Sequence, residues 1–76
     1  MKITGTRSYI DVDFGDKSVR IDGELTTVPS FYAWIDSIKY WKTSNGMILI
    51  DNEERDWIIA EIRNHNNPKF EIIFED

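Results

Sequence analysis

Two stretches of alternating apolar and polar residues, separated by Gly15-Asp16, constrain the fold more than any other feature of the sequence. Apolar side chains recur at nearly every second position in 7–14 and in 18–25. This is the period of a β-strand with one buried face. Glycine tolerates the positive φ that a two-residue hairpin turn can require at its first central position. The pattern therefore predicts a β-hairpin that turns at Gly15-Asp16.

The side chains of the two strands also predict the register of this hairpin. Apart from the pair beside the turn, a two-residue loop sets apolar residues against apolar residues and an acid against a base. The expected pairs are Phe14 with Lys17, Val12 with Val19, Ile10 with Ile21, and Asp11 with Arg20. A loop one residue longer would set Val12 against Arg20, so the shorter loop is expected.

The segment 30–41 fits two secondary structures. As a helix it would carry an apolar stripe from Phe31 to Trp41, with Pro29 near its first turn. Its many aromatic and β-branched residues favour a strand, and the helix stays open as an alternative. A strand would point one set of side chains inward and another outward: Phe31, Ala33 and Ile35 inward, and Tyr32, Trp34 and Asp36 outward.

One helix is expected between two further short strands. After a turn at 43–46, the apolar run 47–50 predicts a short buried strand or an extended lead-in. Asp51 and Glu54 have the spacing of a capping box, so a helix should begin there and run to about Asn64. Alternation in 70–75 predicts a closing strand. On the helix, one face should carry Ile58, Ile62 and His65, and 66–68, which includes a proline, should end it.

These expectations describe a single α+β domain over residues 1–76. An antiparallel sheet of four or five strands would pack on one helix, or on two if 30–41 is helical. A chain of 76 residues can bury roughly 60 % of its unfolded surface. Without cysteine it can form no disulfide, so its ten aromatic residues must carry much of the core.

The acidic charge of the chain is concentrated in its last third. Residues 1–50 are neutral overall, whereas 51–76 carry eight acids and three bases and account for the whole net charge of −5. Such a surface repels nucleic acid and anionic lipid and attracts basic proteins. No run approaches the length of a membrane span, the N-terminus lacks the apolar run of a signal peptide, and cysteine is absent. We therefore expect a cytoplasmic protein with neither a nucleic-acid nor a membrane partner.

Residues that could perform chemistry are scarce. His65 is the only histidine, and its place near the end of the predicted helix suits the helix dipole. The carboxylates of Asp11, Asp13, Asp22 and Glu24 share one face of the hairpin, but Arg20 is interleaved with them, as is usual on a solvated face. No glycine-rich phosphate loop occurs. The sequence predicts no catalytic residue, no metal site and no cofactor.

Trp57 is the residue that most suggests an interaction surface. On the predicted helix it lies away from the isoleucine stripe and has glutamates at i−4, i−3 and i+4. Its ring could simply lap over the sheet edge, or it could anchor a basic partner. The outward side chains of 30–36 are also candidate contacts, because exposed aromatic residues in such number indicate a partner or a second covering layer. The candidate partner-binding residues are Trp57, Glu53, Glu54, Glu61, Tyr32, Trp34 and Asp36.

Several short elements of the chain form a recognisable set: the opening run Met-Lys-Ile-Thr-Gly-Thr-Arg-Ser-Tyr-Ile at 1–10, Gly23-Glu24-Leu25, Phe31, Ser37-Ile38 and Trp41. Together they resemble a family of small bacterial immunity proteins, immunity protein 74. The resemblance covers nearly the whole chain. It departs at Lys42-Thr43-Ser44, where the family carries an acid and prolines, so no contact is carried over to that loop.

The resemblance implies a non-enzymatic cytoplasmic antidote that binds the toxin domain of a polymorphic-toxin system. The acidity suggests a basic toxin. A different class of function remains open: a general interaction or regulatory module, including a weak homodimer through an aromatic face. A small enzyme subunit or metal-dependent hydrolase is disfavoured by the scarcity of reactive residues.

Overall fold

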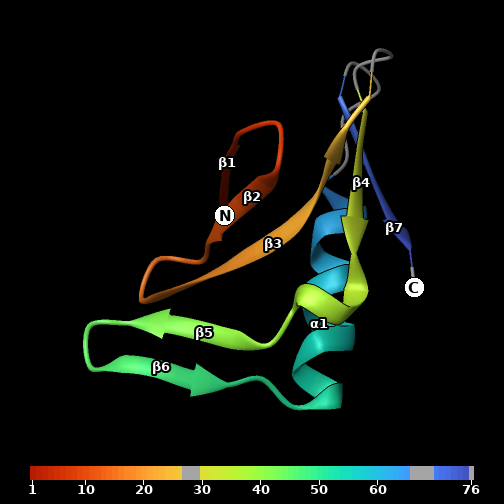
Figure 1. The fold of residues 1–76 in the computed structure, drawn as a ribbon. Coiled ribbons are helices and arrows are strands. Elements are labelled where there is room, and N and C mark those ends of the chain that lie inside the picture. The colour runs from red at the N-terminus through yellow and green to blue at the C-terminus, as the bar shows by residue number, and fades with distance from the viewer. Residues whose placement is uncertain (27–29, 66–69, 76) are drawn as a thin grey trace.

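The computed structural model describes residues 1–26, 30–65 and 70–75. Over these ranges, seven strands form a mostly antiparallel sheet that packs against a single α-helix (Figure 1). The fold is therefore α+β as predicted, with more strands than the four or five expected. In chain order the elements are β1 (Lys2–Gly5), β2 (Tyr9–Asp13), β3 (Lys17–Leu25), β4 (Ser30–Trp34), the 3₁₀-helix η1 (Ile35–Ser37), β5 (Tyr40–Thr43), β6 (Gly46–Leu49), α1 (Asn52–Asn64) and β7 (Glu71–Glu75).

The β2–β3 hairpin has the predicted turn and register. The amide of Phe14 donates to the carbonyl of Lys17 at 2.9 Å, which closes a two-residue loop. Gly15 has a φ of +107°, the region that favours glycine. Beyond the turn the pairs are the expected ones: Val12 with Val19, Ile10 with Ile21, and Asp11 with Arg20.

β3 is the strand on which the sheet divides. One edge of β3 pairs with β2. On the other edge, residues 17–19 pair with β5, and residues 23–25 pair with β4. One branch therefore continues through β5 to β6, and the other continues through β4 to β7 (Figure 1). β4 and β7 run parallel, so the prediction of a wholly antiparallel sheet is wrong at this pair.

The segment 30–41 forms neither one strand nor one helix. It is a strand as far as Trp34, turns through η1, and becomes strand again at Tyr40, so the helical alternative is wrong. The Ser37 hydroxyl occupies the gap between the two branches. It accepts a hydrogen bond from the Asp22 amide of β3 at 2.9 Å and donates to the Trp34 carbonyl at 2.7 Å. A side chain thus replaces a neighbouring strand at the branch point.

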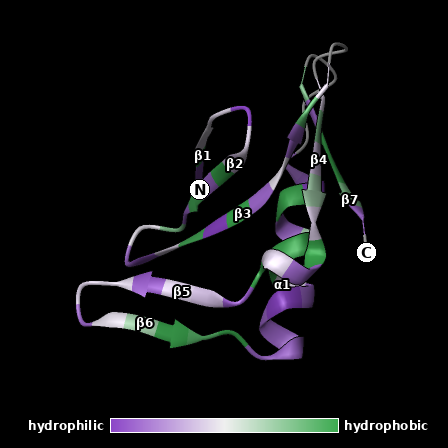
Figure 2. Ribbon diagram, viewed as in Figure 1, coloured by the Kyte–Doolittle hydropathy of each residue, from purple (hydrophilic) through white to green (hydrophobic). Residues whose placement is uncertain are grey.

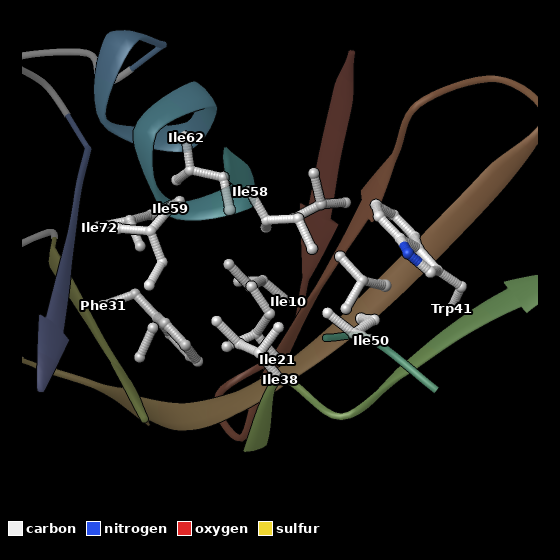
Figure 3. Close-up of a cluster of buried hydrophobic side chains, with 13 residues drawn as sticks. Ile10, Ile21, Phe31, Ile38, Trp41, Ile50, Ile58, Ile59, Ile62 and Ile72 are labelled. Carbon is white, nitrogen blue, oxygen red and sulfur yellow. The ribbon is translucent and has the colours of Figure 1, made fainter. Parts of the chain in front are cut away.

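The core lies between α1 and the face of the sheet that α1 covers, here called the inner face (Figure 3). The capping box at Asp51 and Glu54 begins α1, as predicted. Each fully buried isoleucine stabilises the fold by roughly 1.5–3 kcal/mol. The buried apolar residues are Ile10, Val12, Val19, Ile21, Phe31, Ala33, Ile38, Trp41, Ile50, Ile58, Ile59, Ile62 and Ile72.

One burial prediction, for the run 47–50, is wrong. The predicted short strand or extended lead-in at 47–50 forms β6 and the lead-in to α1, but Met47, Ile48 and Leu49 are 61 %, 54 % and 68 % exposed, and only Ile50 is buried. The cause is position, because the β5–β6 hairpin extends away from α1, as Figure 2 shows. His65 is the C-cap residue of α1, in keeping with its predicted place near the helix end, and is exposed. The predicted helix stop at 66–68 lies outside the described residues, as does Pro29.

No helix in the described ranges is long and apolar enough to cross a membrane.

Candidate protein-interaction surfaces

Trp57 lies on α1 at the start of a column of three aromatic rings that leads into the core. Its side chain is 48 % exposed, and its ring centroid is 5.1 Å from that of Phe14. Phe14 in turn meets the ring of Trp41 edge-on, at 5.6 Å. Trp41 is buried. The core-facing side of the exposed indole therefore packs on Phe14, which in turn packs on the buried Trp41.

Glu54 anchors this region within the chain. One of its carboxylate oxygens, Oε2, accepts a hydrogen bond from Nε1 of Trp41 at 2.9 Å. The other, Oε1, accepts from the Asp51 amide at 3.3 Å, while the Asp51 carboxylate accepts from the Glu54 amide at 2.8 Å. Both oxygens of this half-buried side chain are thus engaged in fixing the helix start against the sheet.

A shallow hollow of about 350 Å³ lies beside the Trp57 ring. Lys17 lines it, with Nζ 4.2 Å from the centre of the Trp41 ring, a cation–π contact. Glu53 lies on the exposed face of the first helical turn. We call this the Trp57 surface; its residues are Trp57, Phe14, Lys17, Glu53 and Glu54.

The second group of candidates lies on the outer face of the sheet, away from α1. The strand register places Tyr32 and Trp34 of β4 there, because Phe31 and Ala33 are buried on the inner face. Trp34 is 47 % exposed and borders a hollow of about 400 Å³. We call this the Trp34 surface; its hollow is lined by Trp34, Asp22, Asp36, Ser37 and Lys39.

Charges elsewhere on the outer face are partly neutralised within the chain. The Arg20 guanidinium donates to both carboxylate oxygens of Asp11, at 2.9 and 3.1 Å, and lies 3.9 Å from the centre of the Tyr9 ring. The hydrogen bond to Asp11 raises the pKa of Arg20 above its usual value. In the described ranges, no group of three or more histidine and acidic side chains is placed to hold a metal ion.

The structure does not unite the seven candidate residues predicted from the sequence. Four lie on α1 and three lie on β4 and η1, on the opposite face of the sheet. On α1, Trp57 and Glu53 are exposed, whereas Glu54 and Glu61 are half-buried; on the outer face, Trp34 and Asp36 are exposed and Tyr32 is half-buried.

Sequence reasoning missed two members of the Trp57 surface, Phe14 and Lys17. The alternation of the first strand places Phe14 on the inner face, which is a usable signal. Its contact with Trp57 depends on how α1 docks across the hairpin end, and no local pattern encodes that.

Comparison with protein families gives one match that spans nearly the whole chain. The model of the immunity protein 74 family matches residues 2–75. Comparison with curated proteins and with solved structures gives no match. The family match covers every strand of the sheet and α1, and a family of immunity proteins implies a cognate toxin as partner. The chain therefore belongs to the immunity protein 74 family.

Proposed function

We propose that this chain binds a cognate bacterial toxin domain in the cytoplasm and neutralises it by occupying part of its surface, without catalysing a reaction. The proposal assigns the contact to the Trp57 surface. The observation that carries this assignment is the half-exposed Trp57 ring, which rests on Phe14 beside exposed acids of α1.

A supported tryptophan is well suited to anchor a complex. Hot spots of protein interfaces are enriched in tryptophan that fills a pocket of the partner. The contact with Phe14 already restricts the Trp57 ring, so binding costs less side-chain entropy than it would for a free ring. Among the described rings, Trp34 has no comparable ring contact, which favours the Trp57 surface over the Trp34 surface.

The charge of the helical region indicates the chemistry of the partner. Glu53 and Asp56 are exposed near the start of α1 and, three residues apart, share one face of the helix. They belong to the part of the sequence that carries the whole net charge. Complementary charge at the rim of an interface accelerates encounter. The expected partner therefore presents an apolar pocket bordered by lysine or arginine.

Two tryptophans of nearly equal exposure provide a matched test. The toxin domain encoded beside the gene is the binding probe, measured by calorimetry and by survival of cells that express it. Trp57→Ala should weaken binding by about 30-fold, the equivalent of about 2 kcal/mol. Trp34→Ala, which removes an equally exposed ring from the opposite face, should leave the affinity unchanged.

Charge reversal gives a second pair of variants. Glu53→Lys should slow association and reduce its salt dependence, whereas Asp36→Lys on the outer face should change neither. If Trp34→Ala and Asp36→Lys are the damaging changes, the assignment to the Trp57 surface is wrong. If the wild-type chain neither binds the toxin nor protects cells, the function itself is wrong. Circular dichroism establishes that each variant is folded.

A further inference from the structure

β6 is an apolar strand at a free edge of the sheet. In the part of the chain that the structure describes, it pairs only with β5. Met47, Ile48 and Leu49 are each more than half exposed, and the hairpin extends away from α1 (Figure 2). Soluble proteins usually protect such an edge with charged residues, because it can pair with another strand. β6 carries no charge at any of its four positions.

The backbone groups that face the free edge can be derived from the pairing with β5. The Ile50 amide donates to the Lys39 carbonyl at 2.8 Å, which marks a hydrogen-bonded pair at that end of the hairpin. Hydrogen-bonded and non-bonded pairs alternate along an antiparallel ladder. Ile48 therefore points its N–H and C=O toward β5. The N–H and C=O groups of Met47 and Leu49 point away from β5, toward the free edge.

We propose that two copies of this chain form a dimer by pairing β6 with β6 in antiparallel orientation about a twofold axis at Ile48. In this register, Met47 faces Leu49 of the second copy, and both exchange backbone hydrogen bonds. Ile48 faces Ile48 of the second copy in a non-bonded pair, where Cα atoms approach to about 4.5 Å. The same residues face one another from both sides, as a twofold interface requires.

The side chains that this register brings together are complementary on both faces. On the inner face, Ile48 lies beside Trp41 of the same chain, so the row runs from Trp41 through both copies of Ile48 to the second Trp41. On the outer face, Leu49 lies beside Tyr40, and Met47 lies beside Lys42. Each Leu49 would meet a Met47 of the second copy. No acidic side chain enters either row.

The distribution of charge favours a second copy over a basic partner at this edge. Two chains of net charge −5 repel one another least where acids are absent, and no acid occurs between Asp36 and Asp51. The other two outermost strands of the described sheet do carry charge: Lys2 lies on β1, and Glu71 and Glu75 lie on β7. A basic toxin would find no complementary charge at β6. The dimer contact is thus distinct from the Trp57 surface.

Sedimentation velocity over micromolar to millimolar concentrations tests the dimer with the purified chain alone, so its outcome is independent of the toxin proposal. The dimer fraction of the wild-type chain should rise with concentration. Leu49→Lys should weaken dimerisation at least about tenfold, because two lysines would enter the interface. Ala60→Lys, at an exposed position of α1 outside the interface, should leave dimerisation unchanged. A wild-type chain that stays monomeric, or a Leu49→Lys variant that dimerises normally, would overturn the proposal.

Cysteine crosslinking tests the register. The chain has no cysteine, so a single introduced thiol can form only an intermolecular disulfide. Ile48→Cys should crosslink rapidly on mild oxidation, since the non-bonded pair lies within disulfide reach. Ser44→Cys, in the exposed β5–β6 turn, should crosslink only at the slow rate of random collision. Equal rates for the two variants would overturn pairing about Ile48.

Discussion

Gly23→Ala is expected to destabilise the protein strongly, because β3 and β4 approach too closely there to admit a side chain. A Cβ added at Gly23 would overlap the Tyr32 carbonyl oxygen and would lie 2.6 Å from Cε1 of Phe31. The carbonyl belongs to the backbone of β4 and cannot rotate away while β4 stays paired with β3. Phe31 is fully buried and has little space to move. The two strands must therefore separate.

The size of the effect follows from two contributions. Inserting a methyl group into a packed core costs about 1–3 kcal/mol. Separation also weakens the short β3–β4 ladder, and each net hydrogen bond lost costs about 0.5–1.5 kcal/mol. A total near 3 kcal/mol corresponds to a fall in Tm of roughly 12–24 °C, since a domain of this size loses about 4–8 °C per kcal/mol.

Thermal and urea unfolding, followed by circular dichroism, measure this loss. Glu24→Ala is the control, because Glu24 is the next residue of β3 and its side chain is exposed. It should change the free energy of unfolding by no more than about 0.5 kcal/mol. A Gly23→Ala protein within about 1 kcal/mol of the wild type would refute the close approach of β3 and β4.

Two further substitutions test the hairpin and the helix anchor. Gly15→Val should cost about 1–3 kcal/mol in thermal unfolding through backbone strain alone, because φ is +107° and no atom lies within 4 Å of the added Cβ. Gly15→Asn should cost less, and an unchanged Tm for the valine variant would contradict the turn. Trp41→Phe should cost about 1.5–3 kcal/mol in urea unfolding, because it removes the indole hydrogen bond to the Glu54 carboxylate. A double-mutant cycle with Glu54→Gln that shows no coupling would contradict this bond.

The parts of the fold that local pattern specifies could be predicted from the sequence. The β2–β3 register followed from matching apolar and charged partners across a two-residue turn. The start of α1 followed from Asp51 and Glu54, whose capping box depends only on residues within one helical turn. The strand at 30–34 followed from aromatic and β-branched composition.

The other features of the fold depend on long-range packing or on chain geometry, and local hydrophobic periodicity does not encode either of them. β1 is a short edge strand with a weak pattern and was not assigned. The split at η1 depends on Ser37 reaching the backbone of β3. The run 47–49 has the composition of a buried strand, but it is exposed because the β5–β6 hairpin extends away from α1. Of the candidate site, Trp57 and its acids were identified, but the supporting contact from Phe14 was not.

The parallel pairing of β4 with β7 determines when the chain can fold during its synthesis. Ser30 pairs with Glu71, and Ile72 of β7 is buried against residues from much earlier in the chain. The other six described strands and α1 are therefore synthesised before β7, and until β7 follows, one edge of β4 is unpaired and part of the core is uncovered. Such distant pairing delays folding, and exposed core surface invites aggregation in the interval. A nascent chain that stalls before β7 leaves the exit tunnel therefore cannot complete the core, and it keeps apolar surface exposed until β7 is released.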